Sequence, residues 1–184
     1  MTLTLRLVYD LPMSITNSLE KQSFWITDLP IVGNILIVFG NRGIKELHNL
    51  GNIPVTNQTK AASIPIQYQT FVDDLLAYLH GENIHWNVDL DLSGLDGFMN
   101  DVIELCRRIP YGQTRTYGDL ARMLSRPPAA ARAVGMCLAA NPIPIIIPCH
   151  RVIGKDGKLH GYSGFGGIQT KAALLKLEGA RLMI

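Results

Sequence analysis

A run of closely spaced prolines constrains this chain more than any other feature of its sequence. Residues 141–152 read Asn-Pro-Ile-Pro-Ile-Ile-Ile-Pro-Cys-His-Arg-Val. Pro142 and Pro144 exclude a regular helix, because proline lacks a backbone N–H and clashes with the preceding turn. We therefore expect residues 143–147 to form an extended apolar segment that holds Cys149 in a fixed position at its end.

Cys149 is either a core residue or a nucleophile. A cysteine reacts as its thiolate, and a neighbouring histidine or cation favours that form. His150 follows directly, but adjacent side chains of an extended chain point apart, so we expect it to act through a water molecule. By itself, a cysteine after an apolar run belongs more often to a core than to an active site.

Composition excludes several classes of protein. Hydrophobic residues make up 47% and charged residues 17%, which is typical of a globular chain. No apolar run reaches the roughly 18–20 residues of a membrane span, and the first residues lack the pattern of a signal peptide. The three cysteines, Cys106, Cys137 and Cys149, are far apart and lack metal-ligand spacing. We predict neither disulfides nor a metal, and a cytoplasmic location, or a nuclear one in a eukaryote.

The chain divides into two halves of opposite charge. Residues 89–97 are rich in Asp and Gly, which indicates a connection between domains 1–91 and 92–184. The first has five Lys and Arg against nine Asp and Glu, and the second has twelve against six. The basic second half is typical of a protein that binds a polyanion, although charge alone fits an uneven solvated surface equally well.

The first half predicts a mixture of strands and a helix. Residues 3–9 alternate in polarity like a half-buried strand, and residues 33–40 form a short apolar run bounded by glycines, typical of a buried strand. Residues 44–50 indicate another strand. Apolar residues recur at helical spacing over residues 70–79. We therefore expect an α+β protein.

The second half predicts two short helices joined by a turn. A first helix is expected over residues 98–108. Thr116 is a good N-cap for a helix over 117–124. Ser-Arg-Pro-Pro at 125–128 indicates a turn, and another helix follows over 129–140. This is the helix-turn-helix pattern, which by itself is weak evidence because many helical hairpins bind no DNA.

The helix over residues 129–140 consists mostly of small residues around a single arginine, Arg132. Small residues allow close approach to a DNA groove, and the arginine could fill the space that an extruded base leaves. The alternative is a tightly packed alanine-rich helix with a solvated arginine.

Two further features lie downstream. Residues 161–167 form a glycine-rich loop that carries Tyr162 and Ser163, and it predicts either close approach to a ligand or a plain surface turn. A final helix is expected over 171–178. Glu178 at its C-terminal end is unfavourable with respect to the helix dipole, which indicates either a partner such as a histidine or a plain surface glutamate.

These motifs together resemble the O6-alkylguanine-DNA alkyltransferases. The resemblance is carried by Arg-Ala-Val-Gly at residues 132–135, the segment 141–152, Tyr-Ser-Gly at 162–164 and Leu-Glu-Gly at 177–179. It covers about half of the chain, and the order of several separated motifs makes it specific. The N-terminal half contributes no motif.

The resemblance implies a role for each matching residue. Cys149 would accept the alkyl group, His150 would deprotonate it through water with Glu178 polarising the imidazole, Asn141 would order the turn, and Tyr117 would protonate the departing guanine. Arg132 would replace the flipped base. The other implied residues are Ala131, Gly135, Thr116 and Arg151 as DNA contacts and Val152, Tyr162, Ser163 and Gly164 as the substrate pocket.

The resemblance also implies a fold and a reaction. The N-terminal domain would be ribonuclease-H-like and the C-terminal domain winged-helix-like. A monomer would bind double-stranded DNA and transfer an alkyl group, chiefly methyl, once and irreversibly from O6 of guanine, with O4 of thymine as a further candidate. No cofactor or metal is implied. Two departures are the longer loop around Phe165 and the residues Met136 and Cys137, which stand where small residues are common.

Three other functions compete with this interpretation. A lesion-binding protein with the same reader would lack the acceptor cysteine. A transcription regulator would not require Cys149, His150 and Glu178 together. A cysteine hydrolase would need an oxyanion hole, for which the sequence offers no pattern.

Overall fold

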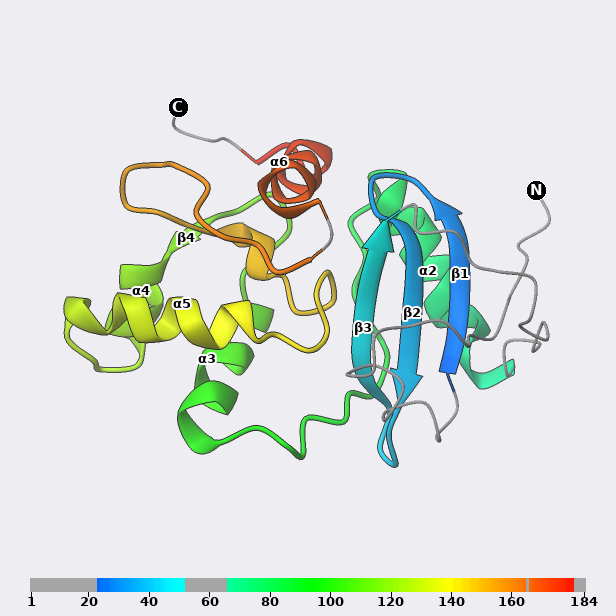
Figure 1. Ribbon diagram of the computed structural model, residues 1–184, viewed down its shortest axis with the longest axis horizontal. Helices are drawn as coiled ribbons and strands as arrows, with labels where there is room; N and C mark the ends of the chain where they lie inside the picture. Colours follow the sequence, from blue (N-terminus) through cyan, green and yellow to red (C-terminus); the bar gives the residue numbers. More distant parts are fainter. Residues whose placement is uncertain (1–22, 52–65, 165, 181–184) are drawn as a thin grey trace. The chain divides into compact units, whose positions relative to one another are not determined.

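The computed structural model describes residues 23–51, 66–164 and 166–180, and the expected strand over residues 3–9 lies outside them (Figure 1). Contacts within the chain divide it into two compact units, Met1–Asp91 and Leu92–Ile184. The division falls in the Asp- and Gly-rich segment. No helix in these three stretches is long and apolar enough to cross a membrane.

The first unit contains an antiparallel sheet of three strands. The strands β1 (Ser23–Leu29), β2 (Gly33–Phe39) and β3 (Ile44–Gly51) lie in the order of the sequence. Every residue of the central strand β2 is buried, which explains why it reads as a continuous apolar run. The strands expected at 33–40 and 44–50 are confirmed.

A helix follows the sheet in the same unit. The 3-10 turn η1 (Ile66–Tyr68) leads into α2 (Gln69–Leu79), as the sequence predicts. Tyr68 stacks on Phe39 of β2 with 3.9 Å between ring centroids, which joins the start of the helix to the sheet. The buried face of α2 includes Phe71, Val72, Leu75 and Leu79, the helical spacing read from the sequence.

The second unit is mainly helical, so the chain as a whole is α+β, as predicted. It contains α3 (Gly97–Arg107), α4 (Tyr117–Met123), α5 (Ala131–Ala139) and α6 (Gly167–Leu177), with the 3-10 turns η2 (Pro128–Ala130) and η3 (Cys149–Arg151). The final helix begins four residues before the expected position. Its N-cap, Gly166, adopts a left-handed conformation with φ 78°, so the glycines that indicated a loop in fact start the helix.

The helices α4 and α5 pack against each other across a short turn (Figure 1). Thr116 caps α4 as predicted. Its hydroxyl accepts a hydrogen bond from the Asp119 N–H, and the Asp119 carboxylate accepts one from the Thr116 N–H. The expected helix over 129–140 starts with the 3-10 turn η2, which Pro128 opens, and α5 proper begins at Ala131.

A short parallel pair of strands connects the helical hairpin to the segment after Cys149. In it β4 (Arg115–Thr116) pairs with β5 (Val152–Ile153), with Arg115 opposite Val152 and Thr116 opposite Ile153. Because Thr116 caps α4 and Val152 follows the turn η3, this pair holds the start of the helical hairpin beside Cys149.

The prediction that residues 143–147 are extended is wrong. The Ile147 N–H donates to the Ile143 carbonyl over 2.9 Å, so the segment folds back in a tight loop. Ile145 has φ 77°, a left-handed conformation that costs a β-branched residue about 1–3 kcal/mol. The prolines exclude a helix but permit a turn, and burial of the isoleucine side chains stabilises the loop.

Candidate active site

Asn141 ties the two ends of this loop together. Its Nδ2 donates to the Ile147 carbonyl over 2.9 Å, and its Oδ1 accepts from the Ile143 N–H over 3.0 Å. The side chain is buried, so these bonds are protected from water. Asn141 thereby fixes the backbone two residues before Cys149.

Cys149 and His150 lie on a 3-10 turn, not on the extended chain that the sequence predicted. The turn η3 begins at Cys149, and both residues are buried. About three residues complete each turn of such a helix, so consecutive side chains differ in direction by roughly 120°. His150 thus faces away from the thiol because of the 3-10 turn, and not because of the alternation of an extended chain.

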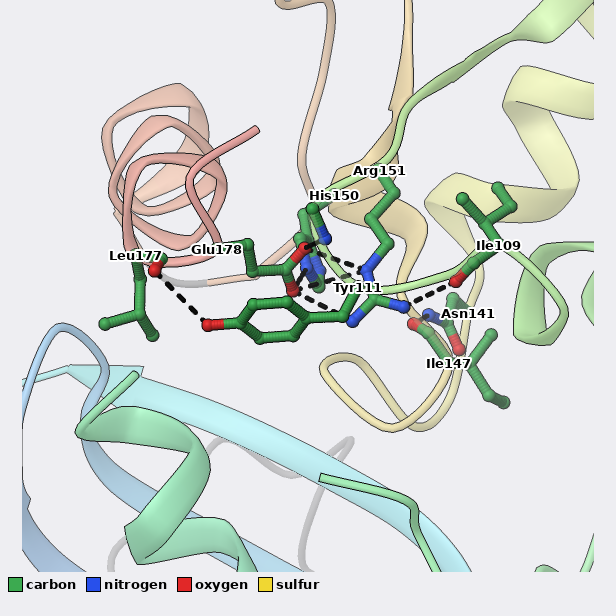
Figure 2. Close-up of polar contacts among 9 residues, drawn as sticks. Ile109, Tyr111, Asn141, Ile147, His150, Arg151, Leu177 and Glu178 are labelled. Carbon is green, nitrogen blue, oxygen red and sulfur yellow. Dashed lines mark hydrogen bonds and ion pairs between the residues drawn. The ribbon is translucent and has the colours of Figure 1, made fainter. Parts of the chain in front are cut away.

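The His150 ring faces Glu178, the C-cap residue of α6 (Figure 2). His150 Nε2 lies 2.8 Å from Glu178 Oε1, and neither side chain is exposed. The same carboxylate accepts from Arg151 Nε over 2.9 Å and from Arg151 Nη2 over 2.9 Å. The Gly112 N–H donates to Oε2 over 3.2 Å. Glu178 is therefore the centre of a buried charged cluster, which accounts for an acid at a helix C-terminus.

The structure contradicts the prediction that Arg151 contacts DNA. Its guanidinium is buried, forks onto Glu178, donates through Nη1 to the Ile109 carbonyl and lies 5.8 Å from the centroid of the Tyr111 ring (Figure 2). A guanidinium held in this way balances the carboxylate and has no access to a phosphate. The sequence around Arg151, two residues after Cys149, did not indicate that its side chain is buried.

Burial sets the protonation states at the centre of the site. It raises the pKa of the Cys149 thiol, which a hydrogen bond with Asn141 and the charge of Lys171 only partly oppose. Burial also lowers the pKa of His150, against the opposing effect of Glu178. At neutral pH the resting pair is therefore a neutral thiol and a neutral imidazole, and the imidazole is able to accept a proton.

Lys171 also lies at this site, and no pattern in the sequence singled it out. Its side chain is buried on α6, and its Nζ donates to the Val152 carbonyl over 2.7 Å and to the His160 carbonyl over 3.1 Å. Burial lowers its pKa to about 8. In sequence it is one lysine near the start of a helix, where lysines are normally solvated.

The same ammonium group reaches Tyr117, the first residue of α4. Lys171 Nζ lies 3.5 Å from the Tyr117 hydroxyl, which itself donates to the His160 carbonyl over 3.0 Å. Burial, followed by the charge of Cys149, raises the pKa of Tyr117. Tyr117 therefore keeps its proton at neutral pH and is available as a proton donor.

A cavity of about 240 Å³ opens onto Cys149. It brings together residues from α4, α5, the turn η3 and the glycine-rich loop: Tyr117, Gly135, Leu138, Ala139, Cys149, Gly161, Tyr162 and Ser163. The Tyr162 hydroxyl is buried and has no hydrogen-bond partner within the described parts of the chain. A buried hydroxyl left in this state favours a ligand that supplies the missing bond.

The remaining predicted pocket residues lie behind the cavity. Val152 is fully buried, and its carbonyl already accepts a hydrogen bond from Lys171. Gly164 supports the Tyr162 ring, because a Cβ added at Gly164 would lie 2.4 Å from the ring atom Cε1. Both residues shape the pocket from outside its lining.

The residues predicted to contact DNA differ in exposure and in the contacts they make within the protein. Arg132 is exposed on α5, and Ala131, half-buried, begins that helix. Gly135 passes close to Tyr117, since a Cβ added at Gly135 would lie 3.7 Å from the Tyr117 ring. Thr116 donates its N–H and its hydroxyl to Asp119, so both of its donors are used within the protein. Contact between Thr116 and DNA stays a prediction.

Comparison with known proteins places this geometry in a family. The profile described as "6-O-methylguanine DNA methyltransferase, DNA binding domain" matches residues 97–180. A methylated-DNA--protein-cysteine methyltransferase of Mycobacterium tuberculosis is 50% identical over 64% of this chain and 68% of that protein. One of Methanosarcina barkeri is 40% identical over 80% of this chain and 91% of that protein.

Solved structures agree with these relatives. The crystal structure of Mycobacterium tuberculosis OGT in complex with DNA superimposes with a TM-score of 0.69 and 42% identity, over 84% of this chain and 91% of that one. Sequence and fold thus match over most of both chains. Because relatives of this name are 40–50% identical over at least two thirds of their own length, the chain belongs to the methylated-DNA–protein-cysteine methyltransferases.

Proposed function

We propose that this protein repairs DNA by moving an alkyl group, chiefly methyl, from O6 of guanine to the sulfur of Cys149. O4 of thymine is a second candidate position. The observation that carries the proposal is the position of Cys149 in the lining of a cavity that also presents the buried Tyr162 hydroxyl. The neutral His150 and its partner Glu178 supply the base that a protonated thiol needs.

Residues of this chain and one water molecule account for every bond and proton of the reaction. His150 takes the thiol proton through a water molecule, and Glu178 stabilises the imidazolium that forms. The Cys149 thiolate attacks the alkyl carbon, a C–S bond forms, and the bond from that carbon to O6 breaks. The departing guanine anion takes a proton from Tyr117, and Lys171 beside it stabilises the tyrosinate. The thioether left on Cys149 is stable, so each molecule reacts once.

The buried position of Cys149 requires the base to leave the duplex. The residue is only 6% exposed, so its sulfur cannot reach a base that is still stacked. Exposure of Arg132 on α5 supports its role as the side chain that fills the gap in the stack. Binding would depend mainly on phosphate contacts with the basic second unit and would weaken as salt increases.

Intact mass measurement tests the proposal. We expect a gain of about 14 Da, one methyl in place of a proton, after incubation with duplex DNA containing O6-methylguanine, and peptide mapping should place it on Cys149. Cys149→Ala should show no gain, and Cys137→Ala, which changes the half-buried thiol on α5, should react normally. If the wild-type protein binds this DNA and its mass stays unchanged, the proposal is wrong.

Arg132→Ala should separate base extrusion from chemistry. We expect transfer from duplex DNA to slow by about 10-fold to 100-fold, because an unfilled gap in the stack costs roughly 1–3 kcal/mol. Reaction with free O6-methylguanine should be unchanged, since no stack has to be opened. Single-turnover rates with both substrates measure this, and equal losses on both would refute the role of Arg132.

The folds of the two domains are also part of this proposal. We infer a ribonuclease-H-like first domain over residues 1–91 and a winged-helix-like second domain over 92–184. A monomer located in the cytoplasm, or in the nucleus of a eukaryote, stays a prediction. The presence of Cys149 disfavours a lesion-binding protein that performs no chemistry. The buried cluster around Glu178 disfavours a transcription regulator that uses only α4 and α5.

A further inference from the structure

We propose that Met136 acts as a second, apolar wedge against the DNA strand beside the extruded base. This inference rests on the proposed function. Met136 lies on α5 and is 69% exposed, whereas Val134 and Leu138 of the same helix are buried. A single exposed apolar side chain needs no explanation by itself, so the inference rests on where Met136 lies along α5.

The helix places Met136 between two features that the reaction needs. It follows Arg132 by four residues and precedes the cavity-lining Ala139 by three, so the Met136 side chain is a neighbour of both on the helix surface. The rise from Arg132 to Met136 is about 6 Å, close to two steps of stacked bases. A strand that delivers its base to the cavity and has its gap filled by Arg132 must therefore pass over Met136.

The chemistry of the side chain fits this partner. Deoxyribose and the faces of bases are apolar, and proteins that open a duplex often insert apolar side chains between base steps. Methionine is flexible and polarisable, so it adapts to whichever bases flank the lesion. The basic charge of the second unit brings the phosphates close, and Met136 adds a contact that does not depend on charge. Small residues at this position would leave that space empty.

The distinguishing measurement is the salt dependence of DNA binding in the Cys149→Ala background, where no transfer follows binding. Met136→Ala should weaken binding to a duplex containing O6-methylguanine roughly 10-fold, with an unchanged slope of log K against log salt. Arg132→Ala should reduce that slope by about one. Met136→Leu, which keeps apolar bulk, should bind within about twofold of the parent. The matched control is Met123→Ala, which removes the same side chain from a methionine that is 58% exposed on α4 and should leave binding unchanged.

Three results would overturn the inference. They are unchanged affinity in Met136→Ala, an equal loss in Met123→Ala, and a changed salt slope, which would assign the effect to charge. A second readout is 2-aminopurine fluorescence beside the lesion, which should report less unstacking with Met136→Ala. Failure of the wild-type protein to gain a methyl group would refute the proposed function, whereas normal transfer with an unaffected Met136→Ala refutes this inference alone.

Discussion

Glu178→Ala should lower the free energy of unfolding by about 3–5 kcal/mol, the cost of removing one partner from a buried ion pair. The carboxylate accepts from His150, Arg151 and the Gly112 N–H, and its side chain is fully buried. Its loss would leave the Arg151 guanidinium as an uncompensated charge in the interior. Urea unfolding of the unalkylated protein measures this value.

A matched control uses an exposed pair. Glu104→Ala removes the partner of Arg107 on α3, where both side chains are more than a third exposed, and should cost less than about 1 kcal/mol. Similar losses for Glu178→Ala and Glu104→Ala would show that the buried cluster does not stabilise the fold.

Glu178→Gln should separate stability from chemistry. The amide keeps the shape and one acceptor oxygen, but it removes the charge that raises the pKa of His150. The pKa of His150 would then fall further, and the imidazole would be a weaker base. We expect transfer to slow by about 100-fold, the usual range for impaired general-base catalysis. A rate equal to wild type in a folded Glu178→Gln protein would exclude this role.

Lys171→Met should slow transfer by about 10-fold to 100-fold at pH 7, because it removes a cation that favours both the Cys149 thiolate and the Tyr117 oxyanion. Without that cation the pKa of Cys149 rises further, so the rate profile should move to higher pH. Single-turnover rates between about pH 6 and 9 measure the shift. Lys176→Met, at an exposed position on the same helix, is the control and should leave the profile unchanged.

The free energy of unfolding should also depend on Lys171, and the lowered pKa of this lysine fixes the direction of its change with pH. The folded pKa of Lys171 is about 8, below the ordinary lysine value of 10.5. Between these values the unfolded chain binds more protons than the folded one, so wild-type stability should rise with pH there. Lys171→Met should lack this rise. An identical pH dependence of unfolding in both proteins would show that Lys171 is not buried as a charged group.

Much of the local structure could be predicted from the sequence because its causes are local. The buried strand β2 is bounded by glycines, and Thr116 with Asp119 forms a capping box that starts α4. Such features depend on residues within one turn or one strand of each other. The position of Glu178 at a helix C-terminus indicated only that a partner was possible, and the resemblance to the family named His150 as that partner, which the structure shows.

The burial of Arg151 and of Lys171 was missed because it depends on contacts distant along the chain. The burial of Arg151 depends on Ile109 and Glu178, and the burial of Lys171 depends on carbonyl groups of Val152 and His160. Neither residue type is normally buried, so only the assembled fold reveals the burial. The loop at 143–147 was misjudged because prolines indicate where a helix is excluded but do not choose between an extended chain and a turn.

The parallel pairing of β4 with β5 sets how much positional error the reaction can tolerate. Only two residue pairs join the strand that begins the DNA-reading hairpin to the strand that follows Cys149. A slip of one residue would displace them by about 3.3 Å, as much as the whole separation of reacting atoms in a productive complex. Insertions or deletions within this short ladder would therefore uncouple lesion binding from repair even if every residue of α4 and α5 were unchanged.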